Sequence, residues 1–296
     1  MQYALLGLSA ETSIHAGTGR STGVVDLPIM RESHTNWPCV YGSAVKGALR
    51  GLAQDRVLAQ VLSREDLTHV FGPDTQNASD HAGALSVGDA RLLLLPVRSL
   101  SSHFKWVTCP ALLRRVAADA RRLGLNDAVE YQGTPPKDNE AIVHQTSQKQ
   151  LFLEEFCFEQ KAADLGQLLG WLGRFGAEGF AAALPAQLAI VSDDMFAHLA
   201  TFATPVTPHI AIDNERKAVK AGALWYEETL PPETVLYLAL AANPSRQSGS
   251  NVSAAQVLQK ALGLFGSERP YLQLGGNETV GMGWCRVQTV HTSLGA

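Results

Sequence analysis

The sequence predicts an α+β fold, and three observations support this prediction. The 296-residue chain is 46% apolar and 18% charged, which is typical of a globular protein with a sizeable core. Strand-like segments lie near both ends of the chain, at 2–9 and 273–290. A helical pattern follows the first segment, and another precedes the last. This order fits a ferredoxin-like core with a large insertion between its two halves.

The first elements are expected to be a strand, a long loop and a helix. Gln2–Ser9 is an apolar, strand-like run. Residues 15–42 contain glycine, threonine and proline without a sustained period, which predicts an irregular segment. Ser43 is the expected N-cap of a helix that runs to about Leu62, because apolar side chains recur on one stripe behind it.

The middle of the chain predicts strands, helices and one insertion. Residues 126–149 are polar and charged and include two adjacent prolines, which predicts a mobile insertion. The other expected elements are paired strands at Leu85–Val97 and His103–Thr108, a helix from Pro110 to Leu123, a strand at Leu151–Phe158, a helix at Ala162–Phe175, a turn region at Gly176–Pro185 and a strand at Gln187–Ser192.

The last third predicts a hairpin and the closing half of the core. Thr207–Thr229 has the pattern of a hairpin, with Asp213-Asn214 as the turn signal. The elements that follow are a strand at Thr234–Ala242, a helix that opens with the capping-box residues Ser253 and Gln256 and runs to Leu264, and two strands around a glycine loop between Gln273 and Val290.

Charge and cysteine spacing narrow the class of protein. The formal net charge is −4, whereas most nucleic-acid-binding domains are basic. Five cations and one acid lie between Ser102 and Leu125, so the sequence still allows a local basic face that binds phosphate. The four cysteines form no C-x-x-C pair, which argues against a zinc site and a disulfide framework. With no signal peptide pattern and no apolar run of ~20 residues, we expect a cytoplasmic protein without membrane contact.

Three glycine-containing segments stand out, and further matching stretches spread the pattern over nearly the whole chain. The segments are His15-Ala-Gly-Thr-Gly19 with Gly23-Val-Val-Asp-Leu-Pro-Ile29 and Arg31, then Tyr41-Gly-Ser-Ala-Val-Lys-Gly-Ala-Leu-Arg50, and Gly275-Gly-Asn-Glu-Thr-Val-Gly-Met-Gly283. Their order and spacing resemble signatures of the RAMP superfamily of CRISPR RNA-binding proteins. The pairing of the first and third segments is similar to the backbone subunit of type III-B (Cmr) effector complexes.

This resemblance implies a single ferredoxin-like (RRM-like) RAMP domain over 1–296. Its core would span roughly 1–110 and 230–296, with insertions that include the mobile segment 126–149 and a β-hairpin thumb within 207–230. It implies copies of the chain stacked along a guide crRNA, beside other RAMP subunits and the large subunit of the complex. The paired target RNA would be kinked by the thumb and cut by metal-dependent 2′-hydroxyl attack.

The predicted helix behind Ser43 carries candidate RNA-binding residues. Lys46 and Arg50 are four residues apart and would lie one above the other. Gly47 leaves room for a backbone to approach, and the helix N-terminus at Ser43 attracts phosphate. The residues alone leave a solvated basic face equally open, whereas the resemblance favours contact with the guide RNA.

The glycine loop that begins with Gly275, Gly276 and Asn277 is a second candidate for RNA contact. Its G-x-x-x-x-G spacing is that of a P-loop, but Met282 and Gly283 replace the Lys-Ser/Thr pair, which excludes a Walker site. The residues alone leave a tight turn between strands open. The resemblance implies a loop beside the RNA path, with main-chain N–H groups facing phosphates.

Asp26 is the main catalytic candidate. It is a lone carboxylate in an irregular segment, and the residues alone favour a turn-capping role. A carboxylate there can hold a hydrated Mg²⁺ (or Mn²⁺) against a phosphate, or position a 2′-hydroxyl. In the family that the chain resembles, the matching aspartate is required for target cleavage. We therefore expect Asp26 to be both the catalytic and the metal-binding residue.

His15 and Glu227 are the other catalytic candidates. His15 is close enough in sequence to share the Asp26 loop and could move protons or contact phosphate, with a structural or surface role equally open. Glu227 could complete an active site from a neighbouring subunit's thumb. From the residues alone, an exposed glutamate at the end of a helix or strand is the better interpretation.

Other functions remain open at this point. Within the family, the chain could be a type III-A (Csm) backbone subunit or a RAMP subunit that binds RNA without cutting it. A different class is a stand-alone RAMP endonuclease that processes guide precursors by histidine acid–base catalysis without metal. Chelation of metal ions separates the two kinds of enzyme. It would stop the metal-dependent cleavage of target RNA, and it would not stop the stand-alone endonuclease.

Overall fold

Four antiparallel strands, in the order β14-β1-β12-β4, form the centre of the main sheet. The computed structural model describes residues 1–74, 80–145, 148–266 and 268–294. β1 and β4 run parallel with β12 between them, which is the split βαβ arrangement of a ferredoxin-like core. The chain runs through β1 (Gln2–Ala10), β2 (Cys39–Val40), α1 (Gly42–Leu58), α2 (Arg64–Phe71), β3 (Leu85–Val87), β4 (Ala90–Arg98), β12 (Val235–Ala242), α7 (Ala254–Leu262), β13 (Tyr271–Gln273), η3 (Glu278–Val280) and β14 (Trp284–Thr292).

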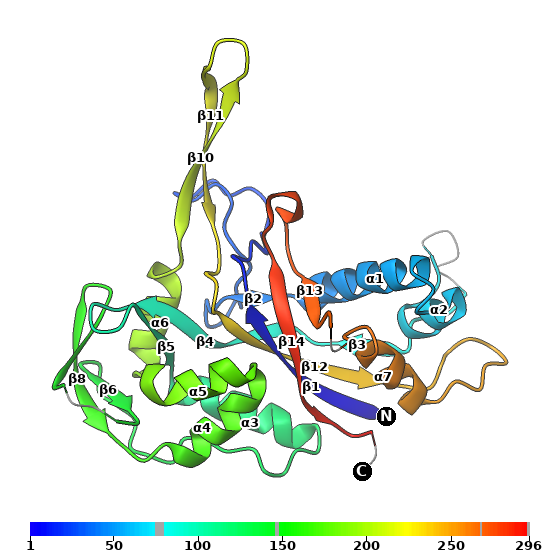
Figure 1. Cartoon of the computed structure of the whole chain (residues 1–296), viewed down its shortest axis with the longest axis horizontal. Helices are drawn as coiled ribbons and strands as arrows, with labels where there is room; N and C mark the ends of the chain where they lie inside the picture. Colours follow the sequence, from blue (N-terminus) through cyan, green and yellow to red (C-terminus); the bar gives the residue numbers. More distant parts are fainter. Residues whose placement is uncertain (75–79, 146–147, 267, 295–296) are drawn as a thin grey trace.

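The segment between β4 and β12 extends the sheet and adds helices. Beyond β4 the strand order continues as β5-β9-β6-β8-β7. Figure 1 shows the inserted strands β6 and β8 at the left of the molecule. The inserted elements are β5 (Phe104–Thr108), α3 (Pro110–Arg122), β6 (Glu140–Val143), β7 (Gln150–Leu153), β8 (Phe156–Ala162), α4 (Gly166–Leu172), η2 (Gly173–Phe175), α5 (Glu178–Gln187), β9 (Leu188–Ile190), α6 (Asp193–Phe202), β10 (Val206–Asp213) and β11 (Ala218–Glu228).

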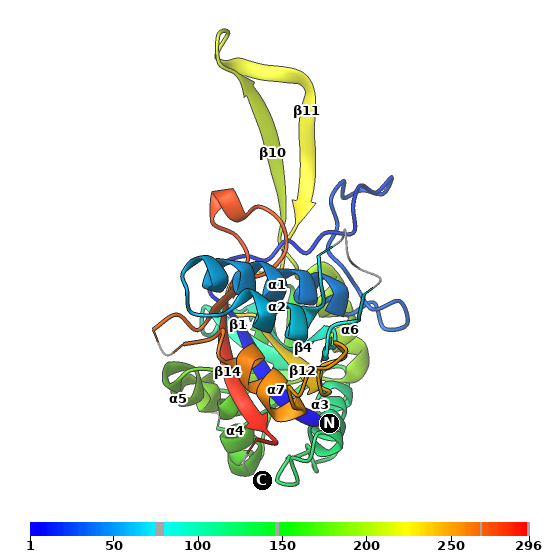
Figure 2. The ribbon, with the colours of Figure 1, turned by 90° about the vertical axis from the view of Figure 1, so that its right-hand side faces the viewer.

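Two apolar cores lie on opposite faces of the sheet. Alternate residues of a strand point to opposite faces, so Leu5 joins one core and Leu6 the other. The core that contains Leu6 includes side chains of α1, α2 and α7, and the core that contains Leu5 includes those of α3, α4 and α5. Figure 2 shows α1, α2 and α7 gathered around the near end of the central strands.

The hairpin formed by β10 and β11 projects from the body of the molecule (Figures 1 and 2). Asp213 closes its tip, where the carboxylate accepts the N–H groups of Glu215 and Arg216 at 2.9 and 3.1 Å. Farther from the tip the strands pair as Ile210 with Leu224, and an irregularity near Gly222 separates the two parts. The predicted hairpin and its turn are confirmed.

Several other predicted elements are confirmed. They are β1, the pair β4–β5, the helix α3 with proline in its first turn, the strand β12, the helix α7 with its Ser253–Gln256 capping box, and the strands β13 and β14 around the glycine loop. No helix in the described part of the chain is long and apolar enough to cross a bilayer.

The prediction for the first helix was wrong at both ends. α1 begins at Gly42 with Tyr41 as its N-cap, because the carboxylate of Asp89 accepts the Gly42 N–H at 2.7 Å. The helix ends at Leu58, and a separate helix, α2, follows. Ser63 caps α2 through its hydroxyl, which accepts the Asp66 N–H. The sequence Ser-x-x-Asp is a local signal that could have predicted this cap.

Segments predicted as single strands divide in two. The expected strand 85–97 breaks into β3 and β4, and the expected strand 151–158 is the hairpin β7–β8, which turns at Glu154 with φ of 50°. Within 126–149, predicted as a mobile insertion, residues 140–143 form β6, whose apolar side chains are buried in the sheet. Residues 146–147 of that prediction lie outside the described residues.

Two further helices, besides α2, were not predicted. The expected turn region 176–185 is mostly helix α5, which holds Pro185 in its last turn. Helix α6 follows β9, and its Ser192 hydroxyl accepts the Met195 N–H at 3.1 Å. Both helices are ten residues long and pack on residues far from them in sequence: α5 packs on β5, and Phe196 of α6 meets the Trp37 ring edge to face. Tertiary contacts therefore outweigh their weak local patterns.

Candidate functional site

Asp26 lies at the base of the hairpin. Its Oδ2 accepts the backbone N–H of Tyr226 at 2.7 Å. The next residue, Leu27, exchanges backbone hydrogen bonds with β11, donating to the Tyr226 carbonyl at 3.0 Å and accepting from the Glu228 N–H at 3.0 Å. The irregular N-terminal segment is therefore held along the end of β11, and Asp26 is fixed beside the hairpin.

His15 and Glu227 lie at the same place. His15 Nδ1 is 2.8 Å from the Glu228 carbonyl oxygen and 3.8 Å from Glu227 Oε1. Because a carbonyl only accepts, Nδ1 carries the proton, and in the neutral ring Nε2 is the acceptor. The side chain of Glu227 is 5% exposed, so the interpretation of an exposed strand-end glutamate was wrong. Around Glu227, β11 pairs with β10 and also with Leu27, and these neighbours cover the glutamate side chain.

The glycine loop packs against His15. The Gly276 N–H donates to the His15 carbonyl at 2.8 Å, so this N–H is engaged within the protein. Gly275 has φ of 86°, and a Cβ there would lie 2.3 Å from the same carbonyl oxygen, so only glycine fits. Asn277 donates from its side-chain amide to Glu227 Oε1. The structure thus brings together six of the predicted residues: Asp26, His15, Glu227, Gly275, Gly276 and Asn277.

Glu228 was missed by the sequence reasoning. Its carboxylate accepts the Ile29 N–H at 3.1 Å, the Thr204 hydroxyl at 2.6 Å and the guanidinium of Arg31. The residue is 6% exposed, and these bonds fix the loop that carries Asp26. The sequence did contain a signal for Glu228. Arg31 ends the first glycine motif, and two adjacent carboxylates, Glu227 and Glu228, end the predicted hairpin.

Ser43, Gly47 and Gly51 form a row of small residues along α1, four apart, with Ser43 and Gly47 exposed. A Cβ at Gly47 or Gly51 would meet no heavy atom within 4 Å, so this row is open to an approaching molecule. Lys46 and Arg50 flank the row, as predicted from their spacing.

The two flanking cations also make contacts within the protein. Lys46 Nζ donates to the Leu85 carbonyl at 3.0 Å, and Arg50 pairs with Asp74 at 2.8 Å. Burial, and then the nearby Arg50 and Arg246, lower the pKa of the Lys46 ammonium. Three cations therefore act on one part of the surface. The α1 row and the Asp26 cluster are linked by Tyr41, whose hydroxyl donates to the Arg31 carbonyl at 3.0 Å.

The donor set around Asp26 fits only one kind of metal site. Within the described residues, no group of three or more His, Cys, Asp or Glu side chains could hold a metal ion. One oxygen of Asp26 already accepts the Tyr226 N–H. Mg²⁺ often takes one or two carboxylates and completes its six ligands with water and phosphate oxygens. Asp26 therefore fits an ion held largely by water and by a bound phosphate.

Comparison with known protein families matches residues 8–286 to the RAMP superfamily. The CRISPR system Cmr endoribonuclease Cmr4 of Pyrococcus furiosus is 35% identical over 294 residues, which cover 97% of this chain and 95% of that protein.

Solved structures agree with this match. The crystal structure of oligomeric Cmr4 from Pyrococcus furiosus superposes with a TM-score of 0.74 at 28% identity, covering 98% of this chain and 99% of that one. A chain from the cryo-EM structure of the type III-B Cmr-beta complex bound to cognate target RNA superposes with a TM-score of 0.72 at 22% identity, covering 97% of each chain. The second likeness shows the shared fold.

Proposed function

Because this chain belongs to the RAMP superfamily and is similar to Cmr4 over nearly its whole length, we propose that it is a backbone subunit of a type III-B CRISPR effector complex. The subunit is an endoribonuclease that binds the guide RNA and cuts the target RNA paired with it. The activity follows from the Cmr4 endoribonuclease, which is 35% identical.

One observation carries the assignment of the cleavage site. The Asp26 carboxylate is held by the Tyr226 N–H at the base of a hairpin that projects from the body. A strand of RNA displaced by that hairpin would pass the carboxylate. The backbone bond fixes the position of Asp26 before RNA arrives, so little ordering is needed at the moment of reaction.

The reaction proposed is attack of a target 2′-hydroxyl on its own 3′-phosphate. The new O–P bond forms as the bond to the 5′-oxygen of the next nucleotide breaks. The departing 5′-oxygen takes up a proton from water, which leaves a 2′,3′-cyclic phosphate and a 5′-hydroxyl. A bound Mg²⁺ would neutralise charge on the phosphate. Asp26 would hold that ion or orient the 2′-hydroxyl. His15, with its proton on Nδ1, would offer Nε2 to a proton from the nucleophile.

Glu227 and Asn277 are proposed to position His15 rather than to act on RNA themselves. Asn277 donates to the Glu227 carboxylate, which lies 3.8 Å from His15 Nδ1. These contacts would hold the orientation of the His15 ring. Both residues belong to the same chain as Asp26, so no thumb from a neighbouring subunit is needed to supply Glu227.

The guide RNA is proposed to lie along the α1 row. Ser43, Gly47 and Gly51 leave space for the phosphate backbone, and Lys46, Arg50 and Arg246 supply positive charge. Gly275 and Gly276 would border this path through the loop that packs on His15. The proposed partners are the guide crRNA, the target RNA, further copies of this chain in a helical stack, other RAMP subunits and the large subunit.

The test is target cleavage by the assembled complex with Asp26→Ala and Asp26→Asn. Complexes are reconstituted with guide RNA, complementary target RNA and Mg²⁺. We expect cutting to fall at least 100-fold in both variants, with guide binding and assembly unchanged, because one catalytic group typically contributes about 10²–10⁴ in rate. Asp194→Asn, which alters an exposed carboxylate in the first turn of α6, is the matched control. Loss of assembly in both Asp26 variants would make Asp26 a structural residue.

A second arm removes the metal. We expect EDTA to stop cutting by the wild-type complex and added Mg²⁺ or Mn²⁺ to restore it. Cutting that continues in EDTA and is lost in His15→Ala would instead favour the metal-independent acid–base endonuclease. Assembled complexes that bind target RNA and leave it whole would favour a subunit that does not cut.

A further inference from the structure

A largely buried ion pair beside the proposed cleavage site joins three separate segments of the chain. Arg31 lies five residues after Asp26, and Glu228 is the last residue of β11. Their side chains are 15% and 7% exposed and contact each other through Arg31 Nη2 and Glu228 Oε1. Water competes weakly for a pair buried to this extent, so the surrounding hydrogen bonds decide its geometry.

The guanidinium of Arg31 ties the N-terminal segment to helix α6 and to the start of the hairpin. Its Nη1 donates to the carbonyls of Asn36 and Ala200, each at 2.8 Å. Ala200 lies in the last turn of α6, where carbonyl groups lack partners within the helix. Nη2 donates to the Thr204 hydroxyl at 3.4 Å and to Glu228. The planar fork of an arginine reaches all of these acceptors at once, which the single ammonium of a lysine could not do.

Glu228 fixes the segment that carries the two catalytic candidates. Its Oε2 accepts the Ile29 N–H at 3.1 Å, and its backbone N–H donates to the Leu27 carbonyl at 3.0 Å. Its own carbonyl oxygen accepts the His15 Nδ1–H at 2.8 Å. Leu27 is the neighbour of Asp26 in the chain. One residue therefore holds both His15 and the backbone next to Asp26.

We propose that Arg31 and Glu228 are positioning residues for target cleavage, which set the places of the Asp26 carboxylate and the His15 imidazole. This role rests on the proposed function, because it concerns the same cleavage site. Neither side chain needs to touch RNA, since the contacts described here lie within the protein. Misplacing a catalytic group by about 1 Å can lower a rate about 100-fold. Loss of the pair should therefore slow the cutting of bound RNA without weakening its binding.

The test measures the cleavage rate and RNA binding separately. Reconstituted complexes with Mg²⁺ are used in excess over labelled target RNA, which gives the rate constant at saturation and the complex concentration at half saturation. We expect Arg31→Gln and Glu228→Gln each to lower the saturating rate constant about 10–100-fold. The half-saturating concentration should not change. A wild-type rate constant in both variants would overturn the proposal.

The double variant, Arg31→Gln with Glu228→Gln, separates positioning from stability. Each single substitution leaves one buried charge without its partner, which destabilises the fold, whereas the double variant leaves none. Its unfolding midpoint should therefore lie above that of the less stable single variant. Its rate constant should stay low, because the fork that reaches Asn36 and Ala200 is still missing. A rate that recovers together with the midpoint would make the pair only structural. If a single variant does not assemble, the double variant carries the test.

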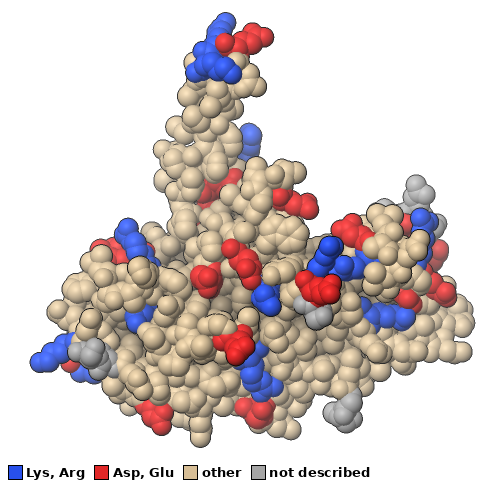
Figure 3. Space-filling view, in the orientation of Figure 1, with Lys and Arg blue, Asp and Glu red and all other residues tan. Residues whose placement is uncertain are grey.

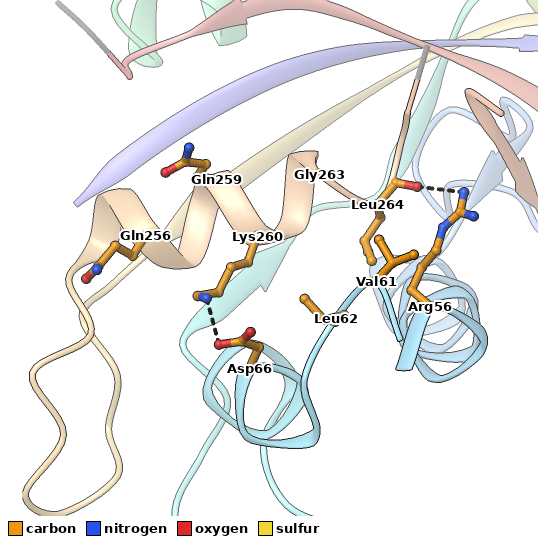
Figure 4. Close-up of a pocket in the computed structure, with 9 residues that line it drawn as sticks. All are labelled: Arg56, Val61, Leu62, Asp66, Gln256, Gln259, Lys260, Gly263 and Leu264. Carbon is orange, nitrogen blue, oxygen red and sulfur yellow. Dashed lines mark hydrogen bonds and ion pairs between the residues drawn. The ribbon is translucent and has the colours of Figure 1, made fainter. Parts of the chain in front are cut away.

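An ion pair elsewhere in the body provides the matched control. Lys260 of α7 contacts Asp66 of α2 at 2.6 Å, beside a cavity of about 410 Å³ between α1, α2 and α7 (Figure 4). This pair also joins two elements that are distant in sequence, and it lies away from the hairpin (Figure 1). Lys260→Gln should leave the saturating rate constant unchanged. An equal loss of rate in Lys260→Gln and Arg31→Gln would overturn the proposal, because any lost ion pair would then have this effect.

Asp26→Asn in the same assay separates this role from the proposed function. Slow cutting by Asp26→Asn, Arg31→Gln and Glu228→Gln alike is the expected result. If Asp26→Asn cuts at the wild-type rate, the cleavage site itself is misassigned and the positioning role is lost with it. If Asp26→Asn is slow while the Arg31 and Glu228 variants cut normally, only the positioning role is wrong.

Discussion

Asp26, His15 and Glu228 show how single residues at the hairpin base depend on backbone groups. Asp26 binds a backbone N–H of β11, His15 binds a backbone carbonyl of the same strand, and Glu228 holds the Ile29 N–H. Each contact joins residues about 200 positions apart. The proposed cleavage site is thus built where the N-terminal segment is hydrogen bonded to the end of the hairpin.

A buried network of hydrogen bonds and ion pairs, away from the proposed cleavage site, joins helix α3 to the sheet. The Tyr237 hydroxyl, on β12, donates to Asp119 of α3 at 2.8 Å. Asp119 also pairs with Arg91 and Arg122 at 3.0 and 2.9 Å. Burial is the first cause that raises the pKa of Tyr237 to about 12. This network connects α3 to the centre of the sheet.

We expect Tyr237→Phe to lower the free energy of unfolding by about 1–2 kcal/mol at pH 7, because Asp119 loses a buried donor. The hydroxyl binds its proton more tightly in the folded state than in the unfolded state, where its pKa is near 10. Its stabilising contribution is therefore complete below pH 10 and is lost as the pH rises towards 12.

The difference between wild type and Tyr237→Phe should thus shrink over the pH range from 10 to 12. Urea unfolding at pH 7, 10 and 12 measures it. Tyr3→Phe is the control, since among the described residues the Tyr3 hydroxyl hydrogen bonds only to the Met1 sulfur, at 3.4 Å. An equal loss of stability in the two variants would mean that the Asp119 contact contributes nothing specific.

Helix α1 illustrates a conflict between stability and function within one element. Glycine in the middle of a helix is destabilising relative to alanine, yet α1 carries Gly47 and Gly51 where a Cβ would have free space. Packing within the protein therefore does not explain these glycines. The close approach of another molecule explains them, and this supports the proposed RNA path.

We expect Gly47→Ala to raise the free energy of unfolding by about 0.5–1 kcal/mol. Gly47→Glu should weaken guide RNA binding by about tenfold, because it places bulk and negative charge where a phosphate would lie. Unfolding in urea and RNA titration at fixed salt measure the two effects.

Gly170 in α4 provides the matched control. It is also an exposed helical glycine whose added Cβ would meet nothing within 4 Å. Gly170→Glu should leave RNA binding unchanged. If Gly47→Glu and Gly170→Glu bind RNA equally well, the guide RNA does not lie along the α1 row.

The whole molecule combines a body with two buried cores and a hairpin whose shaft is apolar and exposed. Six of its exposed side chains are large and apolar: Val206, Ile210, Ile212, Val219, Leu224 and Tyr226. Figure 3 shows a group of Lys, Arg, Asp and Glu side chains at the tip of the hairpin. An isolated two-stranded hairpin is at best marginally stable in water, and exposed apolar surface of this kind marks a binding site. The hairpin is therefore expected to be covered in the assembled complex.

We expect a shortened hairpin to separate folding from cleavage. Replacing residues 211–223 by Asn-Gly joins Ile210 to Leu224, which pair directly, through a two-residue turn. The removed side chains lie outside both cores, so the free energy of unfolding should change by less than about 0.5 kcal/mol. Target cutting in the reconstituted complex should be lost.

The control for this variant keeps the full shaft. Replacing only residues 214–217 by Asn-Gly joins Asp213 to Ala218, which also pair directly. This variant should still cut the target. Normal cutting by the shorter hairpin would show that the shaft is not needed to displace RNA.

The sequence by itself determined the elements whose signals are local. The strand pattern of β1 and β12, the proline that opens α3, the capping box of α7 and the turn at Asp213 each depend on residues only a few positions apart. The glycine motifs similarly made Asp26, His15 and the α1 row candidates, because motif order and spacing are properties of the chain alone.

Only the tertiary structure decided the contacts between distant segments. The Asp89 carboxylate that starts α1, the burial of Glu227 and the Glu228 network all depend on residues that no local pattern connects. Hydrogen bonding and burial depend on which groups meet in space. That information becomes available only when the sheet brings β1, β12 and β14 together with the insertion that follows β4.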